Sequence, residues 1–166
     1  MLIVKRVRLD LKDLKVFKKN ILILSPYEDD LKNLVKFSDT RYIYNFFSHS
    51  IHLLKHLDKF NTDSVIIISS KVEDDDYTNI IKQILNKSNL HRIIVLAKLC
   101  SVAEISLAMK LGVYHVSVGK NCYKDTISCL DKFFHELNEK TLTRDLKKTM
   151  ESNLLMILDN LEHYFP

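Results

Sequence analysis

Residues 64–76, SVIIISSKVEDDD, combine an apolar run with two serines and a block of acidic residues. Residues 65–68 are apolar at every position, which is typical of a strand covered on both faces, as strands of parallel sheets are. A polar loop follows the run directly. Because parallel α/β sheets bind ligands at the carboxyl ends of their strands, the stretch predicts a central strand that delivers Ser69 and Ser70 to the functional edge of a sheet.

Four similar runs occur elsewhere in the chain, and segments with helical periodicity separate them. The runs are 21–24, 42–47, 92–96 and 114–118, and the periodic segments are 29–37, 50–60, 77–85, 102–111 and 124–137. Apolar residues three and four apart indicate helices with one buried face. Five strand–helix units in series predict an α/β fold of the flavodoxin type, with a doubly wound, five-stranded parallel sheet of order 2-1-3-4-5.

Two local signals mark helix boundaries. Ser25-Pro26-Tyr27-Glu28 offers a capping serine, a proline at the first helical position and a glutamate three residues after the cap,. Gly112 follows the fourth periodic segment, where a left-handed cap favours glycine,. The first helix is therefore expected to start at Pro26, and the fourth to end just before Gly112.

Length and composition bound the architecture. A chain of 166 residues with 46% hydrophobic residues suffices for one sizeable core,. We expect a basic extension over residues 1–19, a globular domain over 20–140 and an amphipathic helix over 141–166. No apolar run reaches the ~20 residues of a membrane span, and no signal-peptide pattern opens the chain. Three cysteines without a Cys-x-x-Cys pattern fit reduced thiols and a cytoplasmic location,.

Residues 105–120, ISLAMKLGVYHVSVGK, resemble the fourth helix, glycine turn and fifth strand of the receiver domain of bacterial two-component response regulators. The resemblance covers roughly residues 20–139 and rests on pattern and spacing. For a typical member it implies an acidic pair after the first strand that binds magnesium, and an aspartate after the third strand that accepts phosphate. It also implies a serine or threonine after the fourth strand and a lysine after the fifth.

The sequence departs from this pattern at every one of those positions, which fall on Ser25, Pro26, Ser69, Ala97 and Gly119. A serine hydroxyl does not replace the carboxylate nucleophile of an acyl-phosphate mechanism, and serine and proline supply no charge for magnesium. We interpret the set as a degenerate phosphorylation pocket. The expected protein is a pseudo-receiver without enzyme activity, cofactor or metal, acting in signalling or transcription regulation through a protein partner or a homodimer.

Two acidic blocks leave a metal-binding or unorthodox phosphorylated receiver as an alternative. They are Glu28–Asp30 and Glu73–Asp76, each next to an expected strand end. The favoured interpretation is that they open helices, whose positive ends acidic residues stabilise by roughly 0.3–1 kcal/mol each. His49, His52 and His56 share one helix face at a spacing that suits a metal,, but surface histidines are the favoured interpretation.

The basic extension leaves DNA contact as a second alternative. Residues 1–19 carry seven basic residues against two acidic ones, a block that attracts nucleic acid or acidic partners. A regulatory domain of a DNA-binding transcription factor would use this arm, or an output domain outside this chain. Alternating apolar residues within the same segment also fit an added edge strand.

The resemblance implies a partner or dimer face built from the fourth helix, fifth strand and fifth helix, lined in part by Ile105, Met109, Tyr114 and Tyr123. Near the end of the chain, apolar residues recur at four-three-four-three spacing, the seam of a short coiled coil. They are Met150, Leu154, Ile157, Leu161 and Tyr164. This helix is expected to pack against its own domain or against a second copy of the chain.

Overall fold

The computed structural model describes residues 19–38, 42–59, 64–88 and 91–162, with side chains as far as residue 154. The strands are β1 (Lys19–Leu24), β2 (Tyr42–Phe47), β3 (Val65–Ser69), β4 (Arg92–Ala97) and β5 (His115–Val118). The helices are α1 (Glu28–Phe37), α2 (Ser50–Lys59), α3 (Tyr77–Lys87), α4 (Val102–Lys110) and α5 (Cys122–Glu162). All strand pairs are parallel and the order is β2-β1-β3-β4-β5. The predicted flavodoxin-like topology is confirmed.

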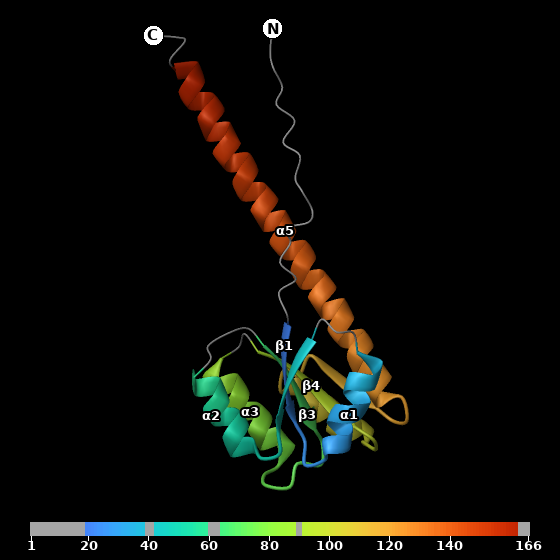
Figure 1. Ribbon diagram of the computed structural model, residues 1–166. Coiled ribbons are helices and arrows are strands. Elements are labelled where there is room, and N and C mark those ends of the chain that lie inside the picture. The colour runs from blue at the N-terminus through green and yellow to red at the C-terminus, as the bar shows by residue number, and fades with distance from the viewer. Residues whose placement is uncertain (1–18, 39–41, 60–63, 89–90, 163–166) are drawn as a thin grey trace.

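Two apolar clusters cover the two faces of the sheet. α2, α3 and α4 pack on one face, and α1 and α5 pack on the other (Figure 1). β3 lies at the centre and is buried at every position. Its side chains alternate between the clusters, with Ile66 and Ile68 in one and Val65 and Ile67 in the other. This double coverage is why the strand is apolar throughout.

The two boundary predictions had different outcomes. Gly112 has a φ of +96°, so it occupies the left-handed region expected after α4. The predicted start of the first helix at Pro26 is wrong, because α1 begins at Glu28 with Tyr27 as its N-cap. The Ser25 hydroxyl donates a hydrogen bond to the buried Asp30 carboxylate and accepts one from the Tyr27 amide at 3.1 Å, so its bonds lie at the turn before α1.

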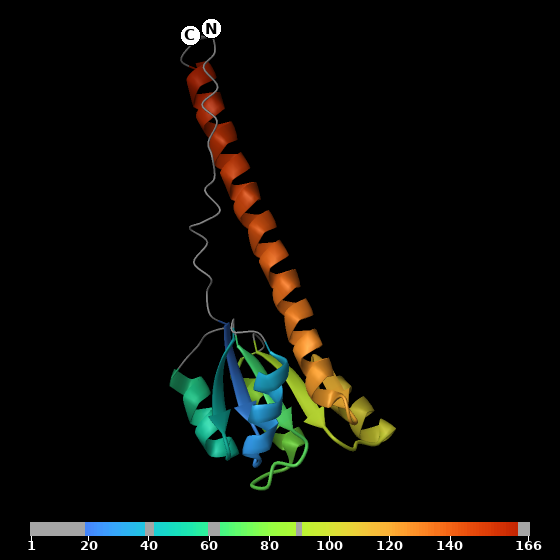
Figure 2. The ribbon, with the colours of Figure 1, turned by 45° about the vertical axis from the view of Figure 1, so that its right-hand side comes forward.

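α5 is a single helix of 41 residues that joins the predicted segment 124–137 to the described part of the helix predicted over 141–166. The sequence between them, Asn138-Glu139-Lys140, contains no glycine or proline that would end a helix,. The helix starts at the carboxyl edge of the sheet, runs back along it and projects well beyond the globular part (Figures 1 and 2). The edge strand predicted within residues 1–19 lies outside the described residues, apart from Lys19, which opens β1. No described helix is long and apolar enough to cross a membrane.

Candidate functional site

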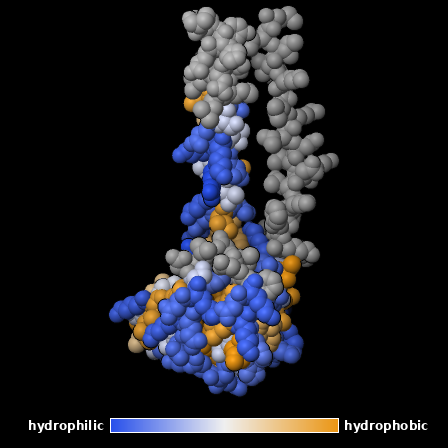
Figure 3. Space-filling view, turned by 90° about the vertical axis from the view of Figure 1, so that its left-hand side faces the viewer, coloured by the Kyte–Doolittle hydropathy of each residue, from blue (hydrophilic) through white to orange (hydrophobic). Residues whose placement is uncertain are grey.

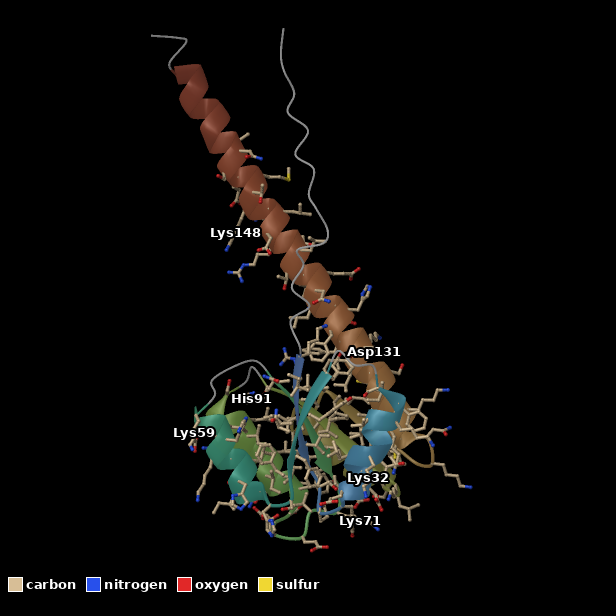
Figure 4. The ribbon with its side chains drawn as sticks, viewed as in Figure 1. Lys32, Lys59, Lys71, His91, Asp131 and Lys148 are labelled. Atoms are coloured by element: carbon tan, nitrogen blue, oxygen red, sulfur yellow. The ribbon has the colours of Figure 1, made fainter. Side chains whose placement is uncertain are left out.

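A pocket of about 170 Å³ opens at the carboxyl edge of the sheet. It lies between the start of α1 and the residues that follow β3 and β4, and its lining is Tyr27, Asp29, Asp30, Ser69, Ser70, Lys71, Leu96 and Lys98. In Figure 4, Lys71 marks this edge, while His91 and Asp131 lie toward the opposite end of the strands. The pocket therefore occupies the place where open α/β sheets bind their ligands.

The positions that correspond to receiver chemistry lie at this edge. Ser69 and Ala97 are the last residues of β3 and β4, and Ser25 and Gly119 directly follow β1 and β5. Ala97 contributes a buried methyl group, and its carbonyl accepts a hydrogen bond from the Gly119 amide at 3.0 Å. Within the described part of the chain, the one hydrogen bond of the Ser69 hydroxyl is a long one, accepted from the Lys71 amide at 3.4 Å. None of these residues, nor Pro26 beside them, carries a charge.

Asp30 supplies the buried carboxylate of this edge; the sequence analysis considered it only within the acidic block Glu28–Asp30, as a metal ligand or a helix-start residue. It is 2% exposed, and each carboxylate oxygen accepts a hydrogen bond. Oδ2 accepts from the Ser25 hydroxyl at 2.6 Å, and Oδ1 accepts from the Tyr123 hydroxyl at 2.5 Å. The Lys98 ammonium lies 3.9 Å from Oδ1. One carboxylate thus joins the end of β1, the residue after β4 and the first turn of α5.

This arrangement satisfies the carboxylate internally. Charge-assisted hydrogen bonds to ionised groups are the strong ones, and Lys98 supplies a counter-charge. Among the described residues, no three His, Cys, Asp or Glu side chains gather as metal ligands would. A signal for Asp30 existed in the sequence, since it precedes the buried Leu34 by four residues and so shares the inward face of α1,.

The environment of Asp30 also affects Tyr123. Burial raises the pKa of the Tyr123 hydroxyl above its usual value of 10.0, and the hydrogen bond to Asp30 and the charge of Asp30 raise it further. The phenol is therefore held in its neutral, hydrogen-donating form. The neutral Tyr123 hydroxyl thus anchors the start of α5 at the carboxyl edge of the sheet through its hydrogen bond to Asp30.

We predict a stability difference in alkaline solution. Because the pKa of Tyr123 is higher in the folded chain, its contribution to stability is fully present below pH about 10 and is lost as pH rises through the folded pKa,. Urea unfolding above that pH should show a shallower loss of stability in Tyr123→Phe than in the wild type. In Asp30→Asn the tyrosinate absorbance of Tyr123 should appear at lower pH. Equal pH slopes in wild type and Tyr123→Phe would contradict the assignment.

The second acidic block forms helix caps. The Asp76 carboxylate accepts from the Thr78 amide at 3.0 Å and caps α3, and Asp74 accepts from the Ser50 amide at 2.7 Å at the start of α2. Glu73 and Asp74 line a separate pocket with Pro26, Ser48 and His49. The interpretation as helix starts is supported, and the two acidic blocks do not line one common pocket.

The histidines and cysteines make structural contacts. His49 shares a hydrogen bond of 2.8 Å with Ser48, its ring lies edge-on to His52, and His56 packs against Phe47. All three cysteines are free. Burial raises the pKa of the Cys129 thiol to about 11 and also raises that of Cys100 and Cys122, so neutral pH favours protonated, weakly nucleophilic thiols.

The four residues expected on a partner face have different surroundings. Met109 is exposed and Ile105 is partly exposed on α4. Tyr114 and Tyr123 are partly buried against the α1/α5 cluster, where the Tyr114 ring packs on Phe133. The most exposed large apolar side chains lie where the chain leaves β4, namely Leu99 (83%) and Val102 (82%). The sequence patterns did not single out these two residues.

The first two residues of the predicted seam lie on the projecting part of α5. Met150 and Leu154 are 71% and 60% exposed. The side chains of Ile157, Leu161 and Tyr164 lie outside the described set. Residues 137–154 are exposed throughout. Leu137 and Lys140 still line a pocket with Ser64, Val65 and Arg92, so the part of the helix that does not pack against the described domain begins after Lys140.

Comparison with known proteins identifies the fold. No model of a known protein family matches the chain, and no curated protein matches it. Solved structures do. A CheY-like response regulator receiver domain protein from Methanospirillum hungatei JF-1 superposes with a TM-score of 0.64 at 12% identity, covering 74% of this chain and 98% of that one. The chain has the receiver-domain fold.

Two further receiver structures show the same similarity. The signal receiver domain of an HD domain-containing protein from Pseudomonas fluorescens Pf-5 has a TM-score of 0.63 at 18% identity, covering 84% of this chain and 98% of that one. The beryllofluoride-activated NtrC4 receiver domain dimer has a TM-score of 0.59 at 20% identity, covering 69% and 98%. The fold is thus shared with receivers although few residues are identical.

Proposed function

We propose that this receiver-like chain is a phosphorylation-independent signalling or assembly module of the cytoplasm, a pseudo-receiver of two-component-type regulation that acts through protein contacts. The observation that carries the proposal is that the Asp30 carboxylate already accepts hydrogen bonds from Ser25 and Tyr123. The position that accepts phosphate in a typical receiver is held by Ser69. An acyl-phosphate mechanism requires a carboxylate free to attack. The only buried carboxylate among the residues lining this pocket is committed to internal partners.

Exposed apolar side chains at the β4–α4 corner support a role in protein contact. Leu99 and Val102 are almost fully exposed, and Met109 continues the surface along α4. Exposed apolar groups that lie together mark interaction sites more often than isolated ones do. Lys110 and Lys120 flank this region in the chain, and both are exposed without an ion-pair partner among the described residues. An acidic, partly apolar protein segment fits these features.

We predict that the chain does not take up a phosphoryl group. With magnesium and acetyl phosphate, intact-mass spectrometry should show an unchanged mass, while a receiver that retains its aspartate gains one phosphoryl group under the same conditions. A magnesium-dependent mass gain that disappears in Asp29→Asn or Asp30→Asn would contradict the proposal. It would favour the unorthodox receiver, since these two acids line the pocket.

Direct DNA contact through residues 1–19 is a second candidate that rests on the charge of this segment, seven basic residues against two acidic ones. Backbone contacts of this kind weaken steeply with salt. Salt-dependent DNA binding that is lost on removal of residues 1–18 would favour this candidate.

A further inference from the structure

The projecting part of α5 carries an apolar stripe that contacts nothing in the described domain. Leu142, Leu146, Met150 and Leu154 are 63%, 54%, 71% and 60% exposed. They recur every four residues, so each is a neighbour of the next on the helix surface, and the stripe turns around the helix by about 40° per step. In sequence, Ile157 follows Leu154 after three residues and Leu161 follows Ile157 after four. Figure 3 shows small apolar areas among the hydrophilic surface of the projecting helix.

This part of the helix has little intrinsic support. One ion pair is described between its side chains, Lys147–Glu151 at 4.0 Å, and an exposed pair of this kind contributes about 0.3–0.5 kcal/mol. The His135 ring lies 3.7 Å from the Glu139 carboxylate and forms an ion pair with it only when protonated. The helix also contains three threonines, a residue type with low helix propensity. The hydroxyls of Thr141, Thr143 and Thr149 donate hydrogen bonds to carbonyl oxygens four residues earlier in the same helix. Helices in water draw most of their stability from packing of an apolar face. The stripe therefore needs a partner.

Charge and backbone chemistry distinguish the possible partners. Residues 138–162 contain four basic and five acidic residues: Lys140, Arg144, Lys147, Lys148, Glu139, Asp145, Glu151, Asp159 and Glu162. Because each helix carries a net charge of only −1, two such helices meet with little net repulsion. The chain's own residues 1–18 are strongly basic and alternate as a strand does, and a single strand laid on a helix would leave its amide and carbonyl groups unpaired. A second helix brings its backbone already hydrogen-bonded.

We propose that residues 138–162 of α5 pair with the same residues of a second copy of this chain, in a two-helix coiled coil centred on Leu146, Met150 and Leu154. The segment would be about 37 Å long at 1.5 Å per residue, room for about three heptads. Figure 4 places Lys148 on this projecting part, far from the globular domain. The inference deepens the proposed function, because it names the protein partner and leaves the carboxyl edge and the β4–α4 corner accessible.

The test compares the full-length wild type with two double variants by light scattering. Wild type is expected at twice the chain mass of 19.5 kDa. Leu146→Glu/Met150→Glu should raise the dissociation constant by roughly 100-fold or more, because two pairs of charges would face each other in the seam. The control, Val35→Glu/Ile51→Glu, changes two apolar residues of similar exposure on α1 and α2 and should stay dimeric.

Circular dichroism adds a second measurement. On dilution, wild type should lose helical signal as the dimer dissociates, and the α5 variant should show the lower signal at every concentration. Its cooperative urea transition should match that of wild type, since the substituted residues do not contact the core. These outcomes are independent of the acetyl phosphate experiment, so failure of one proposal is separable from failure of the other.

Three results would overturn the pairing. One is a monomeric wild type whose helical signal does not change with concentration, which would assign the stripe to the chain's own amino-terminal segment. Another is a dimer that survives Leu146→Glu/Met150→Glu. A third is a dimer abolished by Val102→Glu/Met109→Glu instead, which would place the interface on α4.

Discussion

Replacement of Phe134 by alanine is expected to lower the free energy of unfolding by about 3–5 kcal/mol, the range for truncating a buried aromatic side chain. Phe134 is buried where α5 passes the amino edge of the sheet. Its ring lies 5.6 Å from that of Tyr42 and 5.1 Å from that of Phe133, and the Lys19 ammonium lies 4.2 Å from its centroid. The contacts hold the last packed turn of α5 before the helix projects.

Urea denaturation monitored by circular dichroism measures this effect. The matched control is Leu142→Ala, two turns further along the same helix, where the side chain is mostly exposed and a change within about 0.5 kcal/mol is expected for the α/β unit. Equal losses in both variants would contradict the assignment of Phe134 as the anchor of α5. A loss confined to Leu142→Ala would point to the dimer as the main source of stability.

Replacement of Asp30 by alanine is expected to cost about 2–4 kcal/mol, because it leaves two buried or partly buried hydroxyl groups without their charged acceptor. Those groups belong to Ser25 and Tyr123. Asp29→Ala changes the neighbouring carboxylate, which is exposed and pairs with Lys32, and should cost less than about 0.5 kcal/mol.

A double-mutant cycle isolates the link between the edge and α5. Asp30→Asn and Tyr123→Phe should be non-additive by about 0.5–3 kcal/mol, the range for residues in one hydrogen-bond network. Additive effects would show that Asp30 and Tyr123 stabilise the fold separately. If Asp30→Ala lowers the free energy of unfolding no more than Asp29→Ala does, the hydrogen-bond network of Asp30 does not stabilise this site.

Strands and helices were predictable because their signals are local. β2 was predicted to the residue and the other strands to within two residues, since a run of β-branched residues flanked by polar ones is read from a few neighbours,. The long α5 was predicted as two pieces because apolar periodicity weakens where the helix leaves the domain. The absence of a helix-breaking residue between residues 137 and 141 was the better guide.

The candidate site was predictable only in part. Ser69, Ala97 and Gly119 were located because they directly end or follow apolar runs, and sheet topology brings such residues to one edge. Asp30 was treated as an ordinary helix-start acid, the role that Asp29 does have. These two neighbours face different sides of α1. Asp30 is buried and Asp29 is exposed because α5 packs on only one of those sides.

The sequence by itself determined the five strand–helix units, their parallel order and the lack of charged groups at the strand ends, because apolar runs and residue identities are properties of short segments. Only the tertiary structure decided that the Asp30 carboxylate is buried and which residues bind it. The partners of Asp30 come from residues 25, 98 and 123, the last of them 93 positions away, and no local pattern specifies such a contact. The exposed stripe of α5 was likewise decided by folding, since it lies beyond the last turn that the sheet can cover.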